Sequence, residues 1–225
     1  MGPKGYQVEV IESAPFAENA YVLRRDGSSE AIVVDPSFDV RSIFRKVDQG
    51  QLKVVAIVNT HGHADHIAGN ASMKQTYPDT PLLIGRNDAP LLTDPDANLS
   101  AKFGVPLVSP EADRLVDEGE TVELAGFSFE VREIPGHSPG SVVFICRDFD
   151  PAFVIGGDVL FAGSVGRTDL DYGDGPLLIA GIKAKLFDLA DSTEVWPGHG
   201  PITTIGKERR TNPFVGDNPG AYKLF

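Results

Sequence analysis

Short apolar runs alternate with helical patterns and turn residues along the chain. Several of these runs are rich in β-branched residues and end at Gly, Pro, Asp or Asn, which is typical of β-strands. The stretch RRDGSSE places an Asp-Gly turn between two such runs and predicts a hairpin loop. The predicted strands are residues 7–11, 20–24, 31–34, 54–58, 127–134, 142–146, 153–155 and 194–196.

The spacing of apolar residues predicts helices over residues 39–48, 65–77, 87–92 and 176–188. The stretch 95–120 is rich in Pro and Asp and carries no clear pattern. Strands precede helices in each half of the chain, and the two halves share the same order of elements. This order predicts an α/β fold in which two sheets pack together with helices outside, as a single domain over residues 1–225.

Composition and charge narrow the classes of function. The 225 residues include 41% hydrophobic and 23% charged residues, which is ordinary for a soluble globular protein. A formal net charge of -12 disfavours nonspecific binding to nucleic acid or to anionic membranes. The chain has a single cysteine, Cys146, which excludes an intrachain disulfide framework and favours a reducing compartment. Cys146 itself lies in a predicted strand, and we expect it to be buried in the core. The opening residues lack an apolar signal-peptide region, and no run approaches the ~20 apolar residues of a membrane span, so we expect a cytoplasmic protein.

Histidines and aspartates gather in loops that follow apolar strands. The stretch THGHADH holds three of the five histidines, as His61, His63 and His66, together with Asp65. The other two follow later strands, His137 in IPGHSPGS and His199 in WPGHGP, and IGGDVLF presents Asp158 in the same way. If these strands end side by side, seven donors converge at one edge.

A single histidine in a loop more often caps a turn or faces solvent, and an aspartate after Gly-Gly more often serves the turn itself. The joint pattern favours a metal site, because imidazole and carboxylate groups are the donors that divalent metals require. Structural need alone seldom produces seven such donors in matching loops. The sequence therefore predicts a metal centre.

The HxHxDH motif followed by spaced His, Asp and His resembles the metallo-β-lactamase superfamily, and the resemblance covers nearly the whole chain. It implies an αββα sandwich of two mixed sheets flanked by helices, with a dinuclear site at its edge. It assigns one metal to His61, His63 and His137, the second to Asp65, His66 and His199, and a bridging role to Asp158. Zinc is the default for the two divalent ions, and the same donors accept iron or manganese.

Two further motifs, FAGSVGRTDL and PGHGP, together with TTIGKERRTNPF, are similar to those of the short glyoxalase II-like (hydroxyacylglutathione hydrolase-like) enzymes. That resemblance implies a hydrolase that cleaves a small thioester, such as S-lactoylglutathione, to a hydroxy acid and a thiol. A metal pair can supply a bridging hydroxide as the nucleophile, with Asp65 and Asp158 as catalytic residues that orient it. A thiolate leaves without protonation, which suits a site with no obvious spare general acid.

Several alternatives stay open at this point. Persulfide dioxygenases, which use a single iron, share the GRTD motif, although the intact PGHGP favours the dinuclear hydrolase. A lactonase could use the same site, and a non-catalytic scaffold is the remaining alternative. True β-lactamases of the superfamily usually lack a bridging aspartate, so Asp158 argues against that activity.

Substrate contacts are less well specified. Arg167 is a candidate for substrate binding, although it can equally pair with Asp169. The KERR stretch, with Lys207, Arg209 and Arg210, offers further contacts to an anionic substrate, or it is a solvated surface. Longer glyoxalase II enzymes bind glutathione partly through a C-terminal extension, and this chain ends soon after NPFVGD with NPGAYKLF. The thiol portion of the substrate and the oligomeric state stay open.

Two other motifs are rejected. GHSPG formally matches the GxSxG nucleophile elbow with Ser138, but the following Pro139 lacks the backbone N–H that such an oxyanion hole needs. GPITTIGK departs from the phosphate-binding loop in its glycine spacing, and Glu208 stands where a Ser or Thr would bind magnesium.

Overall fold

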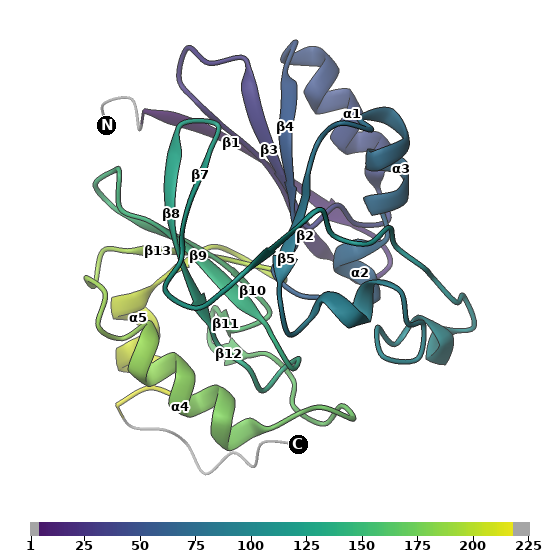
Figure 1. Ribbon diagram of the computed structural model, residues 1–225. Helices are drawn as coiled ribbons and strands as arrows, with labels where there is room; N and C mark the ends of the chain where they lie inside the picture. The colour runs from purple at the N-terminus through teal and green to yellow at the C-terminus, as the bar shows by residue number, and fades with distance from the viewer. Residues whose placement is uncertain (1–4, 218–225) are drawn as a thin grey trace.

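Two β-sheets lie face to face in the computed structural model of the protein, which describes residues 5–217, and helices cover their outer faces (Figure 1). The predicted α/β fold with two mixed sheets is confirmed, because each sheet contains both parallel and antiparallel neighbours. The first sheet has the order β1 (Tyr6–Ser13), β2 (Glu18–Arg25), β3 (Glu30–Val34), β4 (Lys53–Val58), β5 (Leu82–Gly85), β6 (Arg114–Val116). The second has the order β14 (Thr203–Thr204), β13 (Glu194–Pro197), β10 (Phe153–Gly157), β9 (Val142–Cys146), β8 (Phe127–Glu133), β7 (Thr121–Leu124).

All eight predicted strands form, and RRDGSSE joins β2 to β3 as an antiparallel hairpin. The strands that sequence patterns missed are short: β5, β6, β7, β14 and a separate two-stranded ribbon of β11 (Leu160–Phe161) and β12 (Ser164–Val165). Strands of two to four residues show too little alternation to be recognised without their pairing partners.

The central strands are apolar on both faces because each face is covered. Tyr21 and Leu23 of β2 pack between the sheets, whereas Ala20 and Val22 pack beneath the outer helices. In the second sheet, Phe144 faces the first sheet and its neighbour Ile145 faces the helices. Strands buried on both faces have continuous apolar sequences, as these do.

The helices follow local signals. Helix α1 (Val40–Gln49) begins after Asp39, whose side chain accepts a hydrogen bond from the Ser42 N–H at 3.2 Å. Helix α4 (Gly175–Lys185) forms where expected, whereas the predicted helix at 87–92 is a 3₁₀ turn, η1 (Ala89–Leu92). A second 3₁₀ turn, η2 (Ser100–Phe103), lies in the unassigned region, and α5 (Ile205–Thr211) was not predicted.

The prediction of one helix over 65–77 is wrong, because α2 (Ala64–Ile67) ends before α3 (Asn70–Thr76) begins. Gly69 lies between them, and its N–H donates to the Pro36 carbonyl at 2.6 Å. A Cβ at position 69 would lie 2.7 Å from that carbonyl oxygen, so only glycine allows the close approach. The chain therefore forms two short helices in place of the predicted one, and the candidate donors Asp65 and His66 lie in the first of them.

Strand directions bring the predicted loops to one edge. In the second sheet, β10 is parallel to β13, and β8 runs the same way because both β8 and β10 are antiparallel to β9. The carboxyl ends of these strands meet that of β4 from the first sheet. Within residues 5–217 no helix is long and apolar enough to cross a membrane, and the C-terminal NPGAYKLF lies outside the described residues.

Candidate metal centre

The structure brings all seven predicted donors together at this edge. His61 and His63 follow β4, while Asp65 and His66 lie in α2 directly after them. The remaining donors follow strands of the second sheet: His137 after β8, Asp158 after β10 and His199 after β13. The two sheets therefore contribute to one centre.

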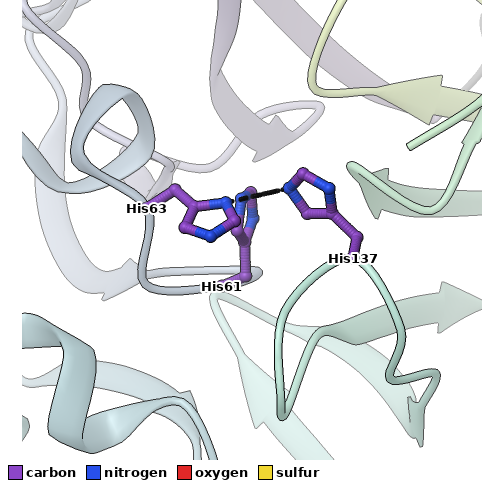
Figure 2. A group of neighbouring side chains, drawn as sticks. All are labelled: His61, His63 and His137. Carbon is purple, nitrogen blue, oxygen red and sulfur yellow. Dashed lines mark hydrogen bonds between the residues drawn. The ribbon is translucent and has the colours of Figure 1, made fainter. Parts of the chain in front are cut away.

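The first group consists of His61, His63 and His137. Figure 2 shows the three rings meeting from two loops, with ring nitrogens of His63 and His137 facing each other. The His63 Nδ1 atom lies 2.9 Å from His137 Nε2, which lies 3.3 Å from His61 Nε2. Two nitrogens on one tetrahedral ion at 2.0–2.1 Å are about 3.3–3.4 Å apart. The spacing between His137 and His61 matches a shared metal ion, and the spacing between His63 and His137 would widen by about 0.4 Å to bind one.

The second group consists of Asp65, His66 and His199. The Oδ2 atom of Asp65 lies 3.4 Å from His199 Nε2 and 4.0 Å from His66 Nε2. One carboxylate and two imidazoles suit a second divalent ion.

Asp158 lies between the two groups. One carboxylate oxygen is 3.4 Å from His66 Nε2, and the other is 3.5 Å from both His137 Nε2 and His199 Nε2. The buried atoms His66 Nε2 and Asp158 Oδ1 have no hydrogen-bond partner among the described residues. Buried polar atoms without partners point to a missing ion or water, so the orphaned pair fits bound metal.

The donors differ in charge state. Burial alone would lower the pKa of His66 and that of His199, but the neighbouring carboxylates outweigh it and raise both, so these two rings are protonated without a metal ion. Burial, reinforced by the neighbouring histidines, lowers the pKa of His61 well below its ordinary value and that of His63 to about 3. Burial alone would raise the pKa of Asp158, but His66 and the other histidines outweigh it and hold that pKa far below its usual range. Neutral imidazoles and ionised carboxylates are the forms that bind metal, so an ion bound by His66 and His199 would displace their protons.

Asp35, which sequence reasoning missed, orients His66. Its Oδ2 atom lies 3.0 Å from His66 Nδ1, and its carboxylate accepts hydrogen bonds from the Thr60 N–H at 2.8 Å and the Thr60 hydroxyl at 2.7 Å. Asp35 adopts a left-handed backbone with φ of 46°, a conformation that is uncommon outside glycine and clusters at functional sites. The sequence signal was VVDP, an aspartate at a strand end like those of the donors.

Asp88 joins the two loops of the first group. Its carboxylate accepts hydrogen bonds from the Gly62 N–H at 2.8 Å, from the Ser138 hydroxyl at 2.7 Å and from the Gly140 N–H. Gly62 lies between His61 and His63, whereas Ser138 follows His137. Ser138 is therefore a buried loop residue that supports the site. This agrees with the sequence argument that GHSPG is not a nucleophile elbow.

The His199 loop is held by β2 of the opposite sheet. The Asn19 side chain donates to the carbonyls of Pro197 at 3.1 Å and Gly200 at 2.8 Å, and the Tyr21 hydroxyl donates to Pro197 at 2.7 Å. Gly198 was also missed by sequence reasoning. A Cβ there would lie 2.2 Å from Asp158 Oδ1, so the loop can approach the centre only with glycine at this position.

A cavity of about 620 Å³ opens onto the centre. Arg167 lines it, but its guanidinium forms a two-point ion pair with Asp169 at 2.6 and 2.7 Å, and its carbonyl lies 2.8 Å from His137 Nδ1. Lys207, Arg209 and Arg210 do not line this cavity, and both arginines pair with Asp191 instead.

Comparisons with known proteins agree with the geometry. Residues 14–199 match the family model of the metallo-beta-lactamase superfamily. The chain is 35% identical over 211 residues to the hydroxyacylglutathione hydrolase GloC of Haemophilus influenzae, covering 92% of this chain and 97% of that protein. It is 38% identical to the solved BLEG-1 B3 metallo-beta-lactamase, with a TM-score of 0.87 over 93% of this chain and 99% of the other. It is 37% identical to TTHA1623 in a di-iron-bound form, with a TM-score of 0.79 over 92% and 99% of the two chains.

Proposed function

The chain belongs to the metallo-beta-lactamase superfamily, and from that premise we propose that it is a dinuclear metal-dependent hydrolase that cleaves a small thioester. One observation carries the proposal: both donor groups are complete, and Asp158 lies between them. The GloC relative, a hydroxyacylglutathione hydrolase, supports a thioester as the substrate. The overall reaction converts a thioester and water into a carboxylate, a thiol and a proton.

His61, His63 and His137 would hold one ion, and Asp65, His66 and His199 the other, with Asp158 shared between them. Ions held there would lower the pKa of bound water to about 7 and polarise the substrate carbonyl. Zinc is the default, and the di-iron form of the TTHA1623 relative supports iron as a second candidate.

The chain's own residues supply the rest of the mechanism. None of the described residues that line the cavity carries a hydroxyl or thiol group. Its carboxylates are either candidate metal donors or, in Asp169, paired with Arg167, which supports water as the source of the attacking oxygen. Asp65 and Asp158 are ionised and can accept hydrogen bonds from that water, which orients it toward the acyl carbon. A C–O bond forms and the C–S bond breaks, and the thiolate leaves with no general acid because it is already a good leaving group.

A second candidate is β-lactam hydrolysis. Asp158 argued against it in the sequence, but the BLEG-1 relative, a B3 metallo-beta-lactamase at 38% identity, supports it. The breaking bond is then an amide C–N bond, whose amine leaving group needs a proton. The described lining offers no acid for this step beyond the donors themselves and two cations already held in ion pairs. This difference favours the thioester.

The test is hydrolysis of S-lactoylglutathione by the purified, metal-loaded protein, repeated after chelation, with a chromogenic cephalosporin assayed in parallel. Thioester turnover that chelation abolishes, and that exceeds cephalosporin turnover, would support the proposal. Cephalosporin hydrolysis with no activity on any thioester would replace it with the second candidate. Equal thioester turnover before and after removal of all metal would refute the metal-dependent mechanism.

A further inference from the structure

The wall of the cavity above the metal centre has a chemistry of its own. Apart from the donors, its polar side chains are all engaged with other parts of the protein. The buried Asn98 amide donates to the carbonyls of Leu91 at 3.1 Å and Leu107 at 3.0 Å, and its oxygen accepts the Ser100 N–H at 3.0 Å. Lys102 pairs with Asp171 at 2.7 Å and Arg167 pairs with Asp169, and both of these ion pairs are exposed to solvent and therefore weak.

The remaining lining is apolar and includes three phenylalanines, of which Phe161 and Phe16 lie beside His199 and Phe103 lies beside Phe16. Phe161 packs edge-on against His199 with ring centroids 6.0 Å apart, and the Phe16 carbonyl lies 3.1 Å from His199 Nδ1. The Phe16 ring meets Phe103 edge-on at 5.2 Å, and Phe103 is 60% exposed. We call Phe161, Phe16 and Phe103 the aromatic track. Ala64, Leu99, Val165 and Leu170 complete the apolar wall.

Single exposed apolar side chains are common, but exposed apolar side chains that form one patch beside a cavity mark a ligand-binding groove. Phe38, 41% exposed, extends the apolar surface, with its ring 5.9 Å from that of Phe16. A small polar acyl group such as lactoyl would leave this surface uncovered. We infer that the natural substrate carries an apolar chain or ring that lies along the aromatic track while its reacting carbonyl meets the metal centre.

This inference rests on the proposed function for the position of the carbonyl, and the apolar group can belong to the acyl or the thiol side. Two series of thioesters distinguish these sources. The first varies the acyl group from acetyl through butanoyl to hexanoyl on N-acetylcysteamine, a neutral thiol. The second keeps acetyl and varies the thiol from ethanethiol through butanethiol to hexanethiol.

Each methylene buried along the track should raise kcat/KM roughly three- to fourfold, mainly through a lower KM. If the added methylenes are partly buried, kcat/KM should rise at least tenfold from the shortest to the longest substrate of one series. The series that shows this rise tells whether the acyl group or the thiol group lies along the aromatic track. If both series are hydrolysed with flat or falling kcat/KM, the inference is overturned while the proposed function stands.

Variants of Phe103 provide a matched test, because the side chain is mostly exposed and lies outside the core clusters. Phe103→Ala should reduce the preference for the long substrate by at least fivefold, and Phe103→Leu should retain most of it. Val105→Ala is the control, since Val105 is 64% exposed in the same segment but does not line the cavity. An unchanged preference in Phe103→Ala would contradict the inference.

A binding measurement separates failure of the inference from failure of the proposed function. Calorimetry would compare acetate with hexanoate, and ethanethiol with hexanethiol, as ligands of the metal-loaded protein. If no thioester is hydrolysed, at least tenfold tighter binding of either long ligand, reduced in Phe103→Ala, would support the track and refute the thioesterase. Equal binding of short and long ligands in both pairs would overturn the inference.

Discussion

The Nδ1 atom of His66 lies 3.0 Å from a carboxylate oxygen of Asp35, while Nε2 of the same ring faces Asp158. The carboxylate therefore orients the imidazole from the side opposite the metal centre. Asp35→Asn should weaken binding of the second metal roughly 10- to 100-fold, as for other residues that orient metal ligands. Metal titration checks this, with Asp117→Asn, an exposed carboxylate paired with Arg86, as the control. Equal metal affinity in both variants would contradict the role of Asp35.

Asp88 offers a second prediction, on stability. Asp88→Asn should lower the free energy of unfolding by about 1–3 kcal/mol, because an amide cannot accept all the hydrogen bonds from Gly62, Ser138 and Gly140. Ser138→Ala removes one donor and should cost about 0.5–1.5 kcal/mol with turnover retained. Denaturant unfolding and thioester assays measure both variants. Loss of all turnover in a folded Ser138→Ala protein would revive a serine nucleophile.

A substitution at Gly198 tests how closely the His199 loop must approach Asp158 and His66. Gly198→Ala places a Cβ within 2.2 Å of Asp158 Oδ1 and 2.6 Å of His66 Cε1, so the carboxylate and the loop must move apart. We expect bound metal to fall from two ions toward one per chain, measured by elemental analysis of the purified variant. Gly200→Ala is unsuitable as a control because Gly200 has a φ of 77°.

The donors themselves can be removed singly. His63→Ala and Asp158→Ala should each lose metal and activity together, while circular dichroism still shows a folded chain. Chelation of the unaltered protein should lower its stability as well. A ligand present at 100 times its Kd stabilises the folded state by about 2.7 kcal/mol, so stripping both ions should lower Tm measurably. Full activity in either variant would refute the assignment of the site.

Cys146 provides a prediction about pH. Its side chain is fully buried in the core between the sheets, and burial raises the pKa of its thiol to about 11. Because this value lies above the ordinary thiol value of about 8.5, the native thiol stays neutral at pH 8 and thiolate forms only as pH approaches 11. A thiol reagent should therefore label the protein at pH 8 only after denaturation. Rapid labelling of the native protein would show that this strand is not buried.

The convergence of the seven candidate donors could be predicted from the sequence, because metal-binding chemistry restricts the residue types. No other common role asks for three histidines and an aspartate within THGHADH. Asp35 and Asp88 could not be recognised in this way, because an aspartate beside Pro or Ala is also an ordinary turn residue. Their partners lie 25 to 52 positions away, and only the folded chain shows that they hold the donor loops.

The two-sheet architecture could also be predicted from the sequence, since strands buried on both faces have long apolar sequences. The division of α2 from α3 was not, because the Pro36 carbonyl that requires Gly69 comes from a distant loop. The predicted role of Arg167 in binding substrate stays a prediction, and its pairing with Asp169 is the alternative that the sequence already offered.

The division of the seven donors between two sheets has a consequence for folding. An ion held by His63 and His137 would close a loop across 74 positions, and one held by Asp65 and His199 a longer loop. Crosslinks that close loops of about 100 residues can stabilise a chain by about 4.7 kcal/mol by restricting its unfolded state. With one cysteine, this chain has no intrachain disulfide, and its metal ions would supply the corresponding restraint. Acquiring metal would then be part of how the two sheets become fastened together, as well as how the site becomes active.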